Sequence, residues 1–402
     1  MHSKTRRLIT LAALAMALPA LAQKQYDPGA SDTEIRLGLP MPYSGPAAGY
    51  SIQGRVAMAY FNKLNDEGGI NGRKVKVVSY DDEYSPPKTV EVVRRMVEQD
   101  EVLAVFGLMG TATNAAVQRY LNAKKVPQLY IASGATRFND PRGNAYTVPF
   151  IPSLTSEGKS FGRHIVQTLP QAKVAVLYQN DDLGRDLLAG LKTGMGDAAK
   201  SQIVAQASYE LSDPTVDSQM VQLKASGANV FVSLSTAKHA AQAIRKAHEM
   251  DWKPELQYLS LVAAFVKTTF EPAGLDASKG IISLAYFKDA GQARWNSDAQ
   301  TQEYKAFMAR YAPKEDIRNA SGVYGYIVAQ TMAQTLRQAG DNLTRANLLK
   351  QATSLGQYSP SMMLPGLAIQ LAPGDYTPLR KVQPVRFDGV ELAPFGAPVA
   401  ME

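Results

Sequence analysis

Residues 34–82 read EIRLGLPMPYSGPAAGYSIQGRVAMAYFNKLNDEGGINGRKVKVVSYDD, and this stretch decides the fold. An apolar run at 35–39 predicts a short strand. Apolar residues at helical spacing over 51–65 predict a helix, and the tight-turn dipeptide Asn71-Gly72 leads from it into a second strand at 75–79. A strand, a helix and a strand in this order predict two parallel strands joined by a right-handed crossover.

The same alternation of strands and helices continues to Thr136 and begins again near Ala172. This pattern predicts an α/β protein with two doubly wound parallel-sheet lobes. The segment 298–354 reads as three helices. After it, apolar runs predict a closing β-ribbon, with strands at 367–371, 382–387 and 390–394.

Three stretches are expected to connect the lobes and to form a three-segment hinge: 147–156, 283–290 and 357–365. The expected N-terminal lobe contains residues 33–150 plus 287–357. The expected C-terminal lobe contains residues 153–283 plus 362–396. A hinge of three segments is stiff but still allows closure around a ligand.

The first 22 residues have the pattern of a secretory signal peptide. Three basic residues, Lys4, Arg6 and Arg7, precede a short uncharged run that ends in Ala20-Leu21-Ala22. The run is too short for a membrane span, which needs about 20 apolar residues. We therefore expect cleavage after Ala22 and export to the periplasm.

The composition excludes several classes of function. The absence of cysteine excludes disulfides, thiolate metal sites and a cysteine nucleophile. Without the predicted leader, the excess of Lys+Arg over Asp+Glu falls from +7 to +4, and no basic stripe with interleaved aromatic residues predicts nucleic-acid binding.

The sequence predicts neither an enzyme nor a metal or cofactor site. His164, His239 and His248 fall on predicted helices without partners at metal-ligand spacing, and neither H-E-x-x-H nor G-x-S-x-G occurs. The acidic clusters 81–83 and 181–182 follow strands, and they are interpreted as helix caps and loop residues.

Three loops of the first lobe are candidate ligand sites, because ligands of open α/β sheets bind beyond the carboxyl ends of the strands. These loops are 43–50, 107–114 and 132–137. In the second loop a helix start offers free amides to a carboxylate, and a threonine could add its hydroxyl or could merely cap the helix. The candidate residues of the second and third loops are Thr111, Thr113, Ser133, Gly134 and Thr136.

Several motifs together resemble the leucine/isoleucine/valine-binding type of periplasmic solute-binding protein. They are Leu39–Pro46, Asp66–Arg73, Tyr80-Asp81-Asp82, Gly107–Asn114, Val126-Pro127, Ser133–Thr136, Tyr178–Asp182 and Val323–Tyr326. The resemblance implies the type I periplasmic binding protein fold and a receptor that delivers solute to an ATP-driven importer. It also implies the partners, a small-molecule carboxylate or amino acid and an inner-membrane ABC permease, and we expect a monomer.

The resemblance carries ligand-binding roles onto particular residues. In amino-acid-binding members, a hydroxyl at the position of Thr111 and groups at Gly134 and Thr136 hold the ligand's head, and Tyr50 matches an aromatic lining residue. The second lobe departs from the family pattern. Val262 stands at or near the position of the acid that pairs with the ligand's ammonium, and Ser235 and Leu183 replace aromatic residues.

A buried ammonium without a counter-charge costs several kcal/mol. Either another acid, such as Asp181 or Asp182, replaces the missing one, or the ligand has no amino group. We favour a small aromatic or other organic carboxylate, enclosed by Val262 and Phe265. Two alternatives remain open: a ligand-sensing receptor of the same fold that is not coupled to transport, and a secreted α/β enzyme.

Overall fold

The computed structural model describes residues 24–402, so the predicted signal peptide and its cleavage site lie outside the described residues. Five parallel strands form the sheet of the N-terminal lobe in the order β3-β2-β4-β5-β6. Their bounds are Glu34–Met41 (β2), Lys74–Asp81 (β3), Ala104–Phe106 (β4), Gln128–Ile131 (β5) and Thr147–Pro149 (β6).

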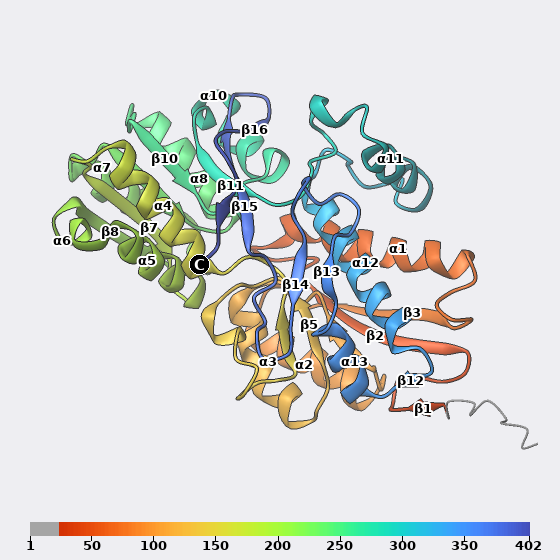
Figure 1. The fold of residues 1–402 in the computed structure, drawn as a ribbon. Helices are drawn as coiled ribbons and strands as arrows, with labels where there is room; N and C mark the ends of the chain where they lie inside the picture. The colour runs from red at the N-terminus through yellow and green to blue at the C-terminus, as the bar shows by residue number, and fades with distance from the viewer. Residues whose placement is uncertain (1–23) are drawn as a thin grey trace, which may run out of the picture.

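The sheet of the C-terminal lobe has the order β16-β15-β11-β10-β9-β7-β8. Its parallel strands are Val174–Gln179 (β7), Ile203–Tyr209 (β8), Val230–Leu234 (β9), Leu256–Leu259 (β10) and Ile282–Ala285 (β11). Lys381–Phe387 (β15) pairs antiparallel with β11, Leu392–Pro394 (β16) pairs antiparallel with β15, and Val399–Ala400 (β17) also pairs with β15. Figure 1 shows this lobe at the upper left and the N-terminal lobe at the lower right.

Helices cover both faces of each sheet, as a doubly wound α/β fold requires. In β7, Val174 and Val176 join the core with α4 (Leu154–Thr168) and α5 (Asp182–Met195). The alternate residues Ala175 and Leu177 join a separate core cluster with α7 (Asp217–Ala225) and α8 (Ala237–Glu249). In the N-terminal lobe the helices are α1 (Ile52–Asp66), α2 (Pro86–Glu98), α3 (Thr111–Ala123), α11 (Ala299–Tyr311), α12 (Ser321–Ala339) and α13 (Arg345–Ala352). The predicted α/β architecture is confirmed. No helix within residues 24–402 combines the length and apolar character that crossing a bilayer requires.

The pair α4 and α5 packs backbone against backbone. Gly158 and Gly162 of α4 face backbone atoms of α5, and Gly190 and Gly194 of α5 face backbone atoms of α4. A Cβ at any of the four would overlap the partner helix. The pair therefore holds the first turn of α4, which carries Glu157, at a fixed position beside the sheet.

The second and third connections between the lobes bind to each other. The amide of Lys288 donates to the carbonyl of Met362 at 2.7 Å, and the amide of Leu364 donates to the carbonyl of Tyr286 at 3.0 Å. The prediction of one closing ribbon is wrong in part. Ile369–Leu371 (β14) pairs with Gly356–Tyr358 (β13) in a separate two-stranded sheet, because β13 lies next to it along the chain, while β15 and β16 extend the large sheet.

Candidate functional site

Tyr50 joins the two lobes across the cleft between them. It closes the loop after β2, and its hydroxyl accepts a hydrogen bond from the amide of Ala237 at 3.0 Å and donates to the carbonyl of Val262 at 2.9 Å. Burial raises the pKa of Tyr50, so the phenol remains neutral. The predicted residues Tyr50 and Val262 thus lie in direct contact.

The hydroxyls of Thr111 and Ser133 lie 2.7 Å apart and are buried at the carboxyl edge of the N-terminal sheet. Thr111 opens α3, whose N-cap is Gly110, so no cap side chain binds the first amides of the helix. Such an uncapped start combines free N–H groups with the positive end of the helix dipole. A carboxylate would find amide and hydroxyl donors here.

Three other predicted residues make contacts of their own. The hydroxyl of Thr113 donates to the backbone carbonyls of Met109 and Gly110. Gly134 packs so closely on Pro152 that a Cβ would overlap the carbonyl oxygen. Thr136 is exposed at the rim, where its amide donates to Asp186 at 2.6 Å. The ligand-binding role of all three stays a prediction.

The residues of the C-terminal lobe that line the cleft are mainly apolar, but the buried hydroxyl of Ser235 nearby has no hydrogen-bond partner. Ser235 is buried after β9, and Val262 lies in the apolar loop 261–265 after β10. The ring of Phe265 meets Tyr50 edge to face, with 6.3 Å between centroids. The ligand-binding role predicted for Ser235 and Val262 is likewise untested by this geometry and stays a prediction.

The acids that could have replaced the missing counter-charge are engaged elsewhere. Asp181 caps α5 by accepting from the amides of Leu183 and Gly184, and its other oxygen accepts from Gln179. Asp182 forms an ion pair with Arg137 across the cleft at 2.9 Å. The capping role inferred from the sequence is confirmed for Asp181.

A small cavity of about 40 Å³ lies between the lobes, room for one or two water molecules. Its wall joins Tyr50, Ala132 and Met109 of one lobe to Val262 and Phe265 of the other. Two buried polar atoms at this wall lack hydrogen-bond partners, Oε1 of Gln53 and the hydroxyl of Tyr324. A ligand that entered the closed cleft would have to displace side chains or hold the lobes further apart.

Glu157 is a buried acid directly behind the C-terminal wall of the cleft. Its Oε1 accepts from the amide of Leu261 at 2.7 Å, and its Oε2 has no partner. Burial raises the pKa of Glu157 to about 8, so the carboxyl is mostly protonated at neutral pH. The group therefore offers little negative charge to the cleft as the structure stands.

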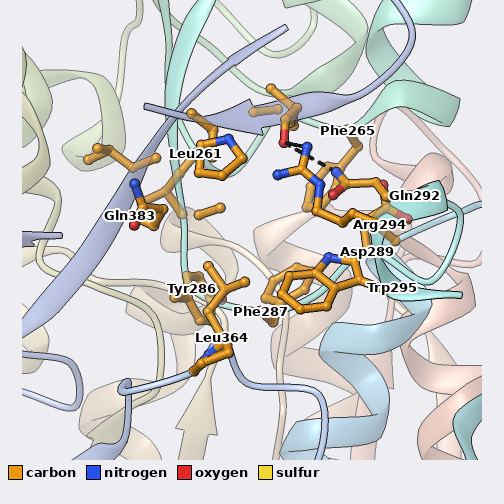
Figure 2. A pocket seen from close by; sticks show the side chains of 18 residues that line it. Leu261, Phe265, Tyr286, Phe287, Asp289, Gln292, Arg294, Trp295, Leu364 and Gln383 are labelled. Carbon is orange, nitrogen blue, oxygen red and sulfur yellow. Dashed lines mark hydrogen bonds between the residues drawn. The ribbon is translucent and has the colours of Figure 1, made fainter. Parts of the chain in front are cut away.

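A larger cavity, of about 300 Å³, lies at the hinge (Figure 2). It shares Leu261, Phe265, Tyr286 and Phe287 with the small cavity, and Trp295 forms part of its rim. Its polar wall includes Asp289, Gln292, Gln383 and Arg294, whose Nε donates to Glu391 at 2.9 Å. Burial raises the pKa of Asp289 to about 6.

Sequence reasoning missed Tyr84, Gln53, Tyr324 and Glu157 as residues of the cleft region. Tyr84 lies in a loop at the carboxyl end of β3, so the rule that selected the other three loops could have found it. Tyr324 lies in the motif Val323–Tyr326, which marked the resemblance without indicating a role at the cleft, and Gln53 and Glu157 lie on helices and carry no comparable signal. Within residues 24–402, no three His, Asp or Glu side chains converge in a way that could hold a metal ion.

Two parallel-sheet lobes that meet across a cleft and share a three-segment hinge define the class of two-lobed binding proteins. The chain belongs to the periplasmic binding protein family, whose model matches residues 34–388. It is a type I periplasmic binding protein of the Leu/Ile/Val-binding type, as the sequence motifs predict. This is a family of solute-binding proteins rather than of enzymes, and it implies a periplasmic location.

Known relatives agree with this assignment. The chain is 22% identical over 329 residues to Leu/Ile/Val-binding protein homolog 7 of Brucella abortus, covering 79% of this chain and 81% of that protein. A branched chain amino acid ABC transporter protein of Thermus thermophilus with bound valine superposes with a TM-score of 0.81 at 16% identity, covering 92% of this chain and 97% of that one. A fatty acid ABC transporter substrate-binding protein of Thermomonospora curvata superposes with a TM-score of 0.76 at 17% identity, covering 93% and 95%.

Proposed function

We propose that this protein is the substrate-binding subunit of a branched-chain amino acid-type ABC importer and that its ligand is a small organic carboxylate without an amino group. An aromatic or other organic acid is favoured over a branched-chain amino acid. The ligand would shift the equilibrium toward the closed form by touching both lobes, and the closed form would deliver it to the membrane permease.

One observation carries the choice of ligand. None of the eleven residues that line the cleft cavity is Asp, Glu, Lys, Arg or His. An ammonium enclosed there would lose its hydration without gaining a counter-charge, which costs several kcal/mol. A carboxylate, by contrast, would find donors at the uncapped start of α3 and in the hydroxyls of Thr111 and Ser133. These groups do not line the cavity but follow its lining residues Met109 and Ala132 closely along the chain.

The similar structures support the view that this fold serves both kinds of ligand. Valine, present in the Thermus thermophilus structure, carries an ammonium and a carboxylate, whereas a fatty acid carries a carboxylate alone. Because Val262 and its neighbours in the loop 261–265 are apolar, we propose that the ligand of this protein carries a carboxylate alone.

Glu157 favours a second candidate, a branched-chain amino acid. Its unpaired Oε2 lies behind Leu261, and an approaching ammonium would lower the carboxyl's raised pKa and favour ionisation. Ligand binding would then have to release a proton from the protein near neutral pH.

A thermal-shift comparison of matched ligands tests the proposal. Leucine and 4-methylpentanoate have the same carbon skeleton and differ only by the amino group, and benzoate supplies an aromatic carboxylate. A ligand at 100 times its Kd stabilises the protein by about 2.7 kcal/mol, enough to raise the Tm by several degrees.

We expect 4-methylpentanoate or benzoate to raise the Tm and leucine to leave it unchanged. A shift with leucine alone would overturn the choice of ligand and favour the candidate based on Glu157. No shift with any of the three would count against the proposed ligand class as a whole.

A further inference from the structure

Tyr84 is a buried phenol whose hydroxyl has no hydrogen-bond partner. It lies between β3 and α2, only 3% exposed, and its oxygen is one of the buried polar atoms without a partner. A buried hydroxyl that makes no hydrogen bond is unfavourable, and proteins rarely retain one without a reason.

The loop that carries Tyr84 is held in an unusual conformation. Glu83 and Tyr84 have φ values of 54° and 57°, the left-handed region that residues other than glycine seldom adopt. Side-chain acceptors hold both residues there. The amide of Glu83 donates to Asp81 at 2.9 Å, and the amide of Tyr84 donates to Asp82 at 3.0 Å.

A third contact fixes this arrangement from α2. The hydroxyl of Thr89 donates to the second oxygen of Asp82 at 2.9 Å. Asp82 is completely buried and accepts hydrogen bonds from both Tyr84 and Thr89. It therefore ties the Tyr84 loop to α2. The strained backbone therefore places the Tyr84 ring in the core, beside Gly110 at the start of α3.

That position is the start of α3. A Cβ on Gly110 would overlap the Tyr84 ring and would lie 2.6 Å from its hydroxyl oxygen, so the phenol rests directly on the residue before the helix. The uncapped amides of α3 and the hydroxyl of Thr111 follow immediately along the chain. The partnerless hydroxyl is therefore next to the place where the proposed carboxylate would bind.

The surroundings keep this hydroxyl protonated. Burial raises the pKa of Tyr84 well above its usual value, and the nearby Asp181, Tyr50, Tyr209 and Asp82 raise it further. A neutral phenol can donate one hydrogen bond, and a carboxylate oxygen is a strong acceptor.

We propose that Tyr84 is a ligand-contacting residue that determines specificity, and that its hydroxyl donates to an oxygen of the carboxylate held at the start of α3. The inference rests on the proposed function and deepens it, because it adds to the predicted head site a donor that the sequence motifs did not indicate. The competing explanation is that the phenol only fills space, in which case phenylalanine would serve equally well.

Two variants that each remove one hydroxyl distinguish these explanations. Tyr84→Phe removes the proposed donor. Tyr304→Phe is the matched control, because Tyr304 is also fully buried with a partnerless hydroxyl but packs against Phe307 and Tyr326 and does not line the cleft cavity. Calorimetric titration with 4-methylpentanoate and with benzoate, and the Tm without ligand, are measured for both variants and the wild type.

We expect Tyr84→Phe to weaken carboxylate binding about 10-fold or more, since hydrogen bonds to charged groups are the stronger ones. Its Tm without ligand should equal or exceed that of the wild type, because an unsatisfied polar atom has been removed. Tyr304→Phe should bind like the wild type.

Equal affinities of Tyr84→Phe and the wild type would overturn this inference and leave the proposed function standing. A fall in affinity matched by a fall in the ligand-free Tm would also overturn it, because the hydroxyl would then support the fold. Failure of the wild type to bind either carboxylate would overturn the proposed function, and this inference with it.

Discussion

The N-terminal face of the cleft presents hydroxyl and amide groups, whereas the C-terminal face presents carbon. On the first side, Thr111, Ser133 and the start of α3 lie next to the lining residues Met109 and Ala132, and the loop 261–265 forms most of the second face. The difference indicates a division of roles under our proposal. The N-terminal lobe would recognise the polar head of a ligand in the open form, and the C-terminal lobe would enclose its apolar part on closure.

The largest effect is expected from a substitution at the start of α3, in the N-terminal face. Gly110→Ala places a Cβ into the Tyr84 ring and forces alanine to φ +97°, so it should lower the free energy of unfolding by about 3 kcal/mol and abolish carboxylate binding. Chemical denaturation and titration measure the two effects.

Gly280→Ala is the matched control for the cost of holding alanine at a positive φ. Gly280 has φ +90° but no atom within 4 Å of its would-be Cβ, so it tests the conformational cost without the overlap. If both variants lose the same stability, the close contact between Gly110 and Tyr84 is not important.

The next effect isolates one hydroxyl of the N-terminal face. Thr111→Val keeps the shape of the side chain but removes the donor beside the uncapped helix, and it should weaken 4-methylpentanoate binding about 10-fold. Thr331→Val is the control, since the Thr331 hydroxyl donates only to the carbonyl of Ile327 within α12. Unchanged affinity in Thr111→Val would place the head group elsewhere.

A third effect tests whether the C-terminal face lacks charge at neutral pH. The pKa of Glu157 is raised from 4.5 to about 8, so between these values the folded protein keeps a proton that the unfolded chain has released. Stability should therefore fall as pH rises through this window, by at most about 1.4 kcal/mol per pH unit.

Glu157→Gln mimics the protonated acid and should remove this part of the slope. The Tm of the variant and of the wild type is measured at pH 5.5, 6.5 and 7.5. Because both proteins contain Asp289, its similar contribution cancels when the two pH profiles are subtracted. Parallel pH profiles would show that Glu157 is ionised, and the apolar description of this face would then be wrong.

The smallest effect on ligand affinity is expected from a substitution in the apolar C-terminal face. Val262→Ala removes two methyl groups from the C-terminal face and leaves the backbone carbonyl that accepts from Tyr50, so it should weaken binding only about 3-fold to 10-fold. Titration with 4-methylpentanoate measures it. A loss greater than that of Thr111→Val would reverse the proposed ranking of the two faces.

The sequence predicted the lobes well because strand, helix and turn signals are local. The pairing of β14 could not be predicted in the same way, since an apolar run such as 369–371 does not specify its partner strand. The family resemblance singled out Tyr50 as a lining position and Val262 as a departure, and the two residues do meet across the cleft, while their ligand-binding roles stay predictions. Glu157 could not be found, because only the packing of α4 brings its carboxyl to Leu261.

The hydroxyl of Tyr50 bonds directly to Ala237 and Val262 of the other lobe, and under our proposal this has a consequence for energy use. Each such hydrogen bond favours the shut form by about 1 kcal/mol, so some empty receptors would be shut at any time. Under the proposed function, an importer that responds to shut receptors would then hydrolyse ATP without transporting solute. Under the same proposal, Tyr50 would raise both the affinity for the solute and the rate of ATP hydrolysis without transport. A gain in affinity would therefore come with a loss of coupling between hydrolysis and transport.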